Sequence, residues 1–148
     1  MLWYGDHLAG IYNGDSMARY NIQLHEPDYF IYSNTYARQH GYGQTKLQAN
    51  TKVAGSNTLS ALVLAHMNQK VTPYYALITE VLEKLPAMAT NSQNGNATLL
   101  VNQNNKQTSL TKLTPKQRQL YEDYKMVQYD LTAGKSYIRK TNFMTKIN

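Results

Sequence analysis

Two short runs of apolar and aromatic residues, 2–4 and 29–33, limit what this chain can fold into. Gly5, Pro27 and Asn34 bound these runs, whose aromatic and β-branched side chains predict two β-strands. Neither run alternates between apolar and polar residues, a pattern typical of strands that lie in a sheet covered on both faces. We therefore expect both strands to be buried. The first strand needs neighbours for its backbone hydrogen bonds, so we also expect it to expose an unpaired edge.

Helical periodicity predicts three helices further along the chain. Apolar stripes indicate helices over about 56–67 and 73–85, the second with Thr72 as N-cap and Pro73 in its first turn. The third helix begins at a capping-box pattern, Thr114-Pro115-Lys116-Gln117, and ends near Gly134.

Polar segments and a second pair of strands fill the remaining sequence. Residues 98–101 and 107–110 predict a β-hairpin that turns at Asn104-Asn105. Residues 35–51 and 91–96 are rich in Gly, Gln and Asn and predict loops. The chain as a whole therefore predicts an α/β protein.

Length and composition exclude several classes of protein. The 148 residues are enough for one domain. Cysteine is absent, which excludes disulfides, thiolate metal ligands and a cysteine nucleophile. No apolar run is long enough to span a membrane, and the first residues do not resemble a signal peptide.

The net charge of +6 is concentrated in the second half of the chain. Residues 75–148 carry ten Lys or Arg against five acids, whereas residues 1–74 carry five against four. A basic surplus is compatible with nucleic acid, anionic lipid or an anionic polymer. Because no four basic residues cluster, we expect a solvated basic face and no nucleic-acid partner. Neither a P-loop nor a Gly-x-Gly-x-x-Gly motif follows a predicted strand, so a nucleotide site is not expected.

Gly5-Asp6-His7, directly after the first strand, is the segment most informative about chemistry. Adjacent Asp and His side chains at the carboxyl end of a strand can reach one cation, and their oxygen and nitrogen donors suit Zn²⁺ or Mn²⁺. Glycine before them lets the backbone turn sharply. The alternative is an ordinary turn with a polar cap.

Three segments resemble the lipoteichoic acid synthases and related sulfatase-like phosphoglycerol transferases of the alkaline-phosphatase superfamily. Residues 3–12 resemble the family's Gly-Asp-His segment. Residues 24–34 resemble its next strand, which ends in Ser or Asn. Residues 124–137, with Tyr129-Asp130, Gly134-Lys135 and Tyr137, resemble its C-terminal motif. The three segments occur in the family's order and extend over most of the chain.

The resemblance implies a metal site that this chain only partly supplies. Asp6 and His7 would ligate a divalent metal, commonly Mn²⁺, with Zn²⁺ or Mg²⁺ as alternatives. The family's Thr or Ser nucleophile and an acidic metal ligand lie far upstream of this pair, and only four residues precede Gly5. The complete enzyme would use that nucleophile to attack a phosphodiester and form a phospho-enzyme. We expect this chain to be inactive alone. Many relatives also have Pro where this chain has Ala9.

The resemblance also implies the organisation of the chain. It would be the C-terminal portion of a sulfatase-like fold, a mixed sheet flanked by helices with a C-terminal hairpin and helix. Its parts would be a metal-loop and strand segment over 1–34, a helical segment over 56–90, and a hairpin plus closing helix over 97–148. The intact protein would face outward from a bacterial membrane and act on a phospholipid or polymer phosphodiester. Its missing N-terminal half would be the main partner, and self-association through the exposed strand edge is an alternative.

His25 is a second candidate for the site, as a metal ligand or a phosphate-binding residue. It precedes the second strand, and related phosphoethanolamine transferases have a histidine near their site after the Asp-His pair. The alternative is a histidine that hydrogen-bonds within its own loop, for instance to Glu26. For the whole chain, the rival hypothesis is a non-catalytic module that binds anionic cell-wall polymer through its basic second half.

Overall fold

The computed structural model describes residues 1–6, 8, 10–12, 14–16, 19–43, 52–69, 71–91 and 97–145. Within these residues the α-helices are α1 Thr35–Gln39, α2 Leu59–His66, α3 Pro73–Lys84 and α4 Pro115–Thr132. The strands are β1 Leu2–Tyr4, β2 Tyr29–Ile31, β3 Ala87–Asn91, β4 Ala97–Val101 and β5 Gln107–Thr108. Short 3₁₀ turns connect them: η1 Gly10–Tyr12, η2 Gln23–His25, η4 Ser56–Thr58, η6 Leu110–Lys112, η7 Tyr137–Lys140 and η8 Asn142–Met144.

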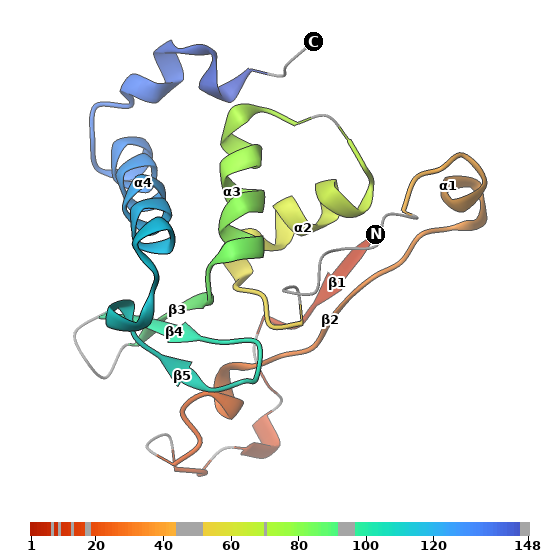
Figure 1. The fold of residues 1–148 in the computed structure, drawn as a ribbon. Helices are drawn as coiled ribbons and strands as arrows, with labels where there is room; N and C mark the ends of the chain where they lie inside the picture. Colours follow the sequence, from red (N-terminus) through yellow and green to blue (C-terminus); the bar gives the residue numbers. More distant parts are fainter. Residues whose placement is uncertain are drawn as a thin grey trace.

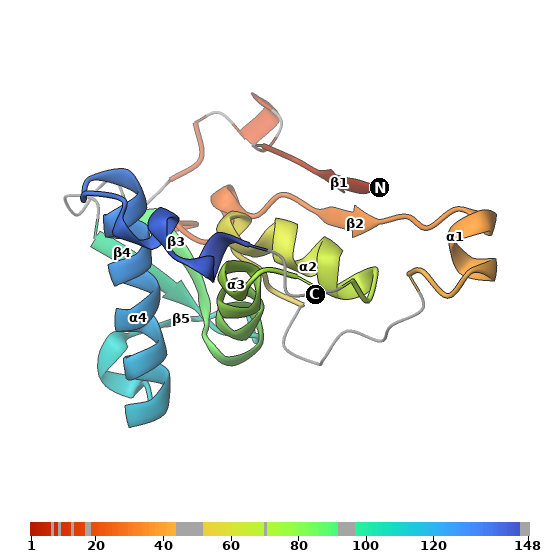
Figure 2. The same ribbon diagram turned by 90° about the horizontal axis from the view of Figure 1, so that it is seen from above.

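The helices separate two small antiparallel sheets (Figure 1). The β3–β4–β5 sheet lies below α3 and α4, and the β1–β2 ribbon lies on the side of α2 that faces away from α4. Figure 2 shows the same order from above, with α1 at the end of an arm that follows β2. This arrangement leaves the N-terminal segment and the three-stranded sheet on two sides of one hollow, described below.

Local sequence signals account for where the long helices begin. The Thr72 hydroxyl accepts a hydrogen bond from the Tyr75 backbone at 3.3 Å, which caps α3. At α4, the Thr114 hydroxyl accepts from the Gln117 backbone at 3.3 Å, and the Gln117 side chain accepts from the Thr114 backbone at 3.0 Å. This reciprocal pair is the predicted capping box. With α2 inside the range expected for the first of them, all three predicted helices are confirmed.

The core lies where the helices meet the three-stranded sheet. Its larger cluster joins α2, α3, β4 and α4 through Ala61, Ile78, Val81, Leu85, Leu100, Leu113, Leu120, Tyr121 and Tyr124. A smaller cluster of Leu59, Leu62 and Leu82 packs against Leu2, Tyr29 and Ile31 of the β1–β2 ribbon. Helix α2 contributes to both clusters, which explains why its sequence is apolar on nearly every side.

Within the described residues, and contrary to expectation, the two aromatic strands are covered on one face only. In the antiparallel register, Leu2 pairs with Ile31 and these side chains face α2, whereas Trp3 pairs with Phe30 on the opposite face. Trp3 and Phe30 are 57% and 58% exposed. A strand contributes alternate side chains to its two faces, so an apolar run covers both only when a layer packs on each. Among the described residues, a layer packs on only one face of the β1–β2 ribbon.

Other elements also differ from the sequence-based expectations. Within the expected 35–51 loop, Thr35–Gln39 forms α1, capped by the Asn34 side chain; residues 44–51 lie outside the described part. Residues 87–91, partly within the expected helical segment over 56–90, form β3, which pairs with β4. The described strands make two antiparallel sheets in place of one mixed sheet. The α/β class itself is confirmed. Among the described residues, no helix combines the length and apolar character needed to cross a bilayer.

Candidate functional site

Asp6 follows β1 directly, at the point where the β1–β2 ladder ends. The Gly5 backbone N–H donates to the Asp28 carbonyl at 3.2 Å, which continues the pairing by one residue beyond Tyr4. Asp6 is the next residue along the chain, and its side chain is exposed. His7 lies outside the described residues.

A hollow of about 890 Å³ opens beside this strand end. Asp6, His25, Glu26 and Asp28 line it from the N-terminal segment. Residues 52–56 form a second wall, and apolar side chains of β3 and β4, including Met88 and Leu99, form a third. Its volume is within the usual range of about 300–1,000 Å³ for small-molecule pockets. Asp6 and His25, which follow β1 and precede β2, therefore lie around one hollow.

The His25 ring bonds within its own loop. Its Nδ1 lies 2.8 Å from the Asn21 carbonyl oxygen, one turn earlier in the chain. Because a carbonyl oxygen only accepts, Nδ1 carries the proton and Nε2 keeps its lone pair in the neutral ring. This is the tautomer in which a histidine can ligate a metal through Nε2. The loop-bonding alternative is correct for Nδ1, but the partner is Asn21 and not Glu26.

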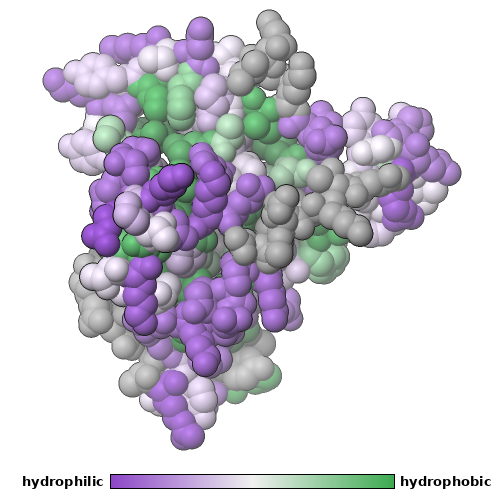
Figure 3. All heavy atoms as spheres, in the orientation of Figure 1, coloured by the Kyte–Doolittle hydropathy of each residue, from purple (hydrophilic) through white to green (hydrophobic). Residues whose placement is uncertain are grey.

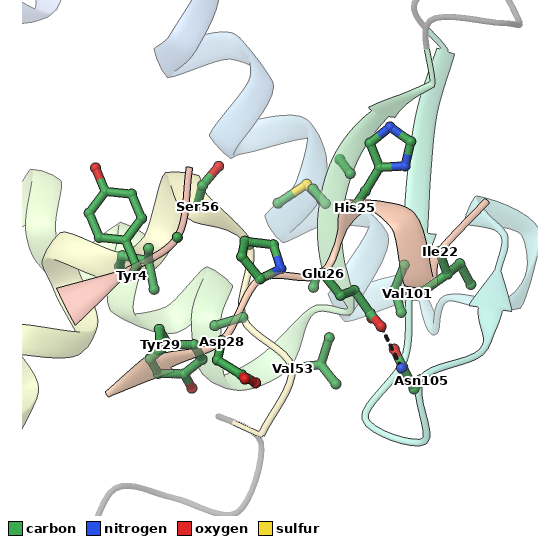
Figure 4. Close-up of a pocket in the computed structure, with 18 of the residues that line it drawn as sticks. Tyr4, Ile22, His25, Glu26, Asp28, Tyr29, Val53, Ser56, Val101 and Asn105 are labelled. Atoms are coloured by element: carbon green, nitrogen blue, oxygen red, sulfur yellow. Dashed lines mark hydrogen bonds between the residues drawn. The ribbon is translucent and has the colours of Figure 1, made fainter. Parts of the chain in front are cut away.

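Glu26 instead joins the N-terminal segment to the three-stranded sheet. Its Oε2 accepts a hydrogen bond from the Asn105 side-chain amide at 2.6 Å (Figure 4). Asn105 lies in the turn between β4 and β5 and has a left-handed backbone, φ 59°. This contact across 79 residues closes one side of the hollow.

The described residues do not by themselves make a metal site. No three His, Asp or Glu side chains among them are grouped so that they could hold an ion. In Figure 4 the His25 ring points away from Asp28, and Glu26 points toward Asn105. Stable divalent sites need more ligands than one carboxylate. Asp6 is compatible with a ligand role only if His7 and further residues complete the set.

Tyr29 also lines the hollow, and sequence reasoning had assigned it only to a strand. Burial raises the pKa of its phenol above the ordinary value. Glu26, Asp28 and Asn105 were likewise missed as lining residues. The first two had a signal, their position next to the second strand, but the contribution of Asn105 depends on a long-range contact that no local pattern indicates.

Comparisons of this chain with models of protein families, with curated proteins and with solved structures found no match.

Proposed function

We propose that this chain is the C-terminal portion of an outward-facing, metal-dependent phosphotransferase or hydrolase of the sulfatase-like type, in which Asp6 and His7 supply part of the metal site. The observation that carries the proposal is the position of Asp6. It lies at the end of a strand, exposed, on the rim of a hollow of about 890 Å³. That is the position expected of a ligand that serves a site completed by other residues.

The β1–β2 ribbon supports the view that the sheet continues into another segment. Met1 and Tyr32 exchange backbone hydrogen bonds at 2.7 and 2.8 Å, and Gly5 bonds to Asp28. In an antiparallel ladder such pairs alternate with residues whose backbone groups face away. The N–H and C=O groups of Leu2 and Tyr4 therefore point away from β2, to an edge of β1 that no other described strand pairs with and where a further strand can pair.

The outer face of the ribbon gives a second reason. The side chains of Met1, Trp3, Phe30 and Tyr32 are uncharged, and each of these residues is more than half exposed. The Trp3 and Phe30 rings are parallel within 5°, with centroids 6.1 Å apart. We name these four residues the aromatic face. An uncharged face beside an open strand edge fits a sheet that another layer covers, as in the family that the sequence resembles.

In the complete protein, the metal would act as a Lewis acid toward a phosphodiester. Asp6 would contribute a carboxylate oxygen, and His25 in η2 would be a further candidate ligand or phosphate-binding residue. The acceptor and the head group would be set by residues outside this chain.

The test begins with the native protein in its source cells. An antibody against this chain should detect a membrane-bound protein several times larger than the chain. That protein, purified by the antibody, should release glycerol phosphate from a glycerophosphodiester when Mn²⁺ is present. Asp6→Asn should abolish the activity, while Asp15→Asn, an exposed carboxylate away from the hollow, should leave it unchanged.

Two outcomes would reject the proposal. One is a soluble protein of the chain's own size, which would favour the rival module that binds anionic cell-wall polymer. The other is a large protein whose activity persists fully in the Asp6→Asn variant, because the metal ligands would then lie elsewhere.

A further inference from the structure

The outward side of the last turns of α4 exposes large side chains. Met126 and Tyr129 are 67% and 65% exposed and lie three residues apart, so they share one face of the helix. Tyr137, also exposed, begins η7. Its backbone N–H donates to the Asp130 carboxylate at 3.1 Å, which holds η7 against this end of α4. Figures 1 and 2 both show the C-terminal turns beside the end of α4. Single exposed apolar residues are common, but a group of them is less so.

Basic residues accompany this group. Residues 133–145 contain Lys135, Arg139 and Lys140 and no acid, and all three cations are exposed. The Lys140 ammonium lies 5.6 Å from the centroid of the Tyr137 ring. The Asp130 carboxylate accepts from two backbone N–H groups of η7, so it has a structural role at this turn. We name the set the basic aromatic surface: Met126, Tyr129, Lys135, Tyr137, Arg139 and Lys140.

The other faces of the molecule differ in composition. Figure 3 shows one face of the molecule, which is hydrophilic over much of its area and has hydrophobic atoms visible mainly in the upper part, where the helices lie. The aromatic face on β1 and β2 is uncharged and adjoins an open strand edge, which suits a polypeptide partner. Within the described part of the chain, the basic aromatic surface brings exposed Tyr and Met side chains together with Lys135, Arg139 and Lys140.

We propose that the basic aromatic surface binds an anionic lipid bilayer at the level of its headgroups. Lys135, Arg139 and Lys140 would contact headgroup phosphates, and Tyr129, Tyr137 and Met126 would enter the interface. Tyrosine is enriched at membrane–water interfaces because its ring is apolar and its hydroxyl polar. Basic residues near an anionic leaflet are attracted by its surface potential. A dissolved polyanion would engage the cations but leave Met126 and Tyr129 in water, so a bilayer accounts for the whole surface.

This inference is independent of the proposed function, because it uses neither the hollow nor the β1–β2 ribbon. Its first test is co-sedimentation of the chain with vesicles of phosphatidylcholine, with and without a minor fraction of phosphatidylglycerol. We expect binding only to the anionic vesicles, and weaker binding as salt is raised. The double variant Arg139→Gln/Lys140→Gln should lose about five-fold in partition coefficient for each cation removed.

A matched variant controls for net charge. Lys106→Gln/Lys112→Gln removes two exposed cations from the β4–β5 turn and from η6, outside the basic aromatic surface. It should keep most of the binding. An equal loss in both double variants would overturn the proposal, because the attraction would then depend on total charge and not on this surface.

The apolar contribution has its own test. Met126→Ser/Tyr129→Ser should weaken vesicle binding several-fold, whereas Tyr42→Ser/Met67→Ser, on exposed side chains elsewhere, should not. Urea midpoints that match wild type show that each variant is folded. Normal vesicle binding by the first variant, together with full competition by soluble polyphosphate, would identify a dissolved polymer as the ligand and reject the bilayer.

Trp3, the single tryptophan, reports on orientation. It lies on the aromatic face, so its emission should stay unchanged when the basic aromatic surface contacts vesicles. A shift of its emission to shorter wavelength on binding would mean that the aromatic face enters the bilayer, which would also overturn the proposal.

Discussion

The Asn57 side-chain amide donates a hydrogen bond to the Tyr124 hydroxyl at 2.7 Å and joins the turn before α2 to the middle of α4. The Gln128 amide donates to the same oxygen at 2.6 Å. Tyr124 is 4% exposed, so its ring belongs to the core while its hydroxyl serves a polar contact between elements 67 residues apart.

Removing this hydroxyl should destabilise the fold without opening a cavity. We expect Tyr124→Phe to lower the free energy of unfolding by about 1–2 kcal/mol, because two amides lose their acceptor. Tyr129→Phe, at an exposed position on the same helix, should change it by less than about 0.5 kcal/mol. Urea denaturation measures both. If Asn57→Ala and Tyr124→Phe have strictly additive effects, the hydrogen bond between the two side chains contributes nothing to the free energy of unfolding.

Alkaline pH should weaken the fold through buried tyrosines. Burial raises the pKa of the Tyr124 phenol, and the hydrogen bond from Asn57 partly opposes this rise. The pKa of Tyr74 is also raised, mainly by burial and further by the neighbouring Tyr124 and Tyr75. The folded state therefore holds these protons more tightly than the unfolded state. The resulting stability is fully present below the unfolded pKa of about 10 and is lost as pH rises through the folded values.

Unfolding free energies measured at about pH 9 and about pH 11 test this directly. The wild-type chain should lose more stability over that interval than Tyr124→Phe does, because the variant lacks one of the titrating groups. Groups that the two chains share contribute equally to both losses, so the difference between the two chains is the informative quantity. Equal losses would contradict the prediction.

The absence of a side chain at Gly43 should allow the α1 arm to contact α2. The Ser33 hydroxyl and His66 Nε2 are 3.0 Å apart, and a Cβ added at Gly43 would lie 2.1 Å from that hydroxyl. Gly43→Ala should therefore break the Ser33–His66 contact and raise hydrogen exchange in α1. Gly41→Ala is the matched control, since Gly41 has a similar φ of +78° but nothing within 4 Å of an added Cβ.

Both glycine variants incur the strain of a left-handed residue, about 1–2 kcal/mol. Gly43→Ala should exceed Gly41→Ala in both destabilisation and amide exchange of residues 35–39. Equal effects would mean that the contact between Ser33 and His66 does not secure the arm.

The open edge of β1 should let the isolated chain self-associate. Sedimentation should show a mass that rises with concentration, and Trp3→Lys should reduce this because an exposed lysine discourages edge-to-edge pairing. Tyr36→Lys, on the exposed side of α1, is the control and should associate as wild type does. A chain that stays monomeric at every concentration would contradict the prediction.

Local patterns were sufficient for the three longer helices α2, α3 and α4, but α1 formed where a loop was expected. Thr72 and Thr114 cap α3 and α4 through bonds to residues three positions later, and such contacts can be read within one turn of sequence. The β4–β5 hairpin was also predictable from its turn. The strand β3 was not, because Ala87–Asn91 has few β-branched residues and its pairing with β4 is not indicated by any local pattern.

For the candidate site too, some features could be predicted from the sequence and others could not. The sequence by itself identified Asp6 as a polar residue at a strand end and His25 as a residue before the next strand. Only the tertiary structure decided that both line one hollow, that Glu26 bonds to Asn105, and that Trp3 and Phe30 face outward. Caps and helical stripes depend on neighbours within a few residues, which the sequence specifies directly. Burial of a strand face and closure of a hollow depend on which distant segments pack together, and this is settled by the whole fold.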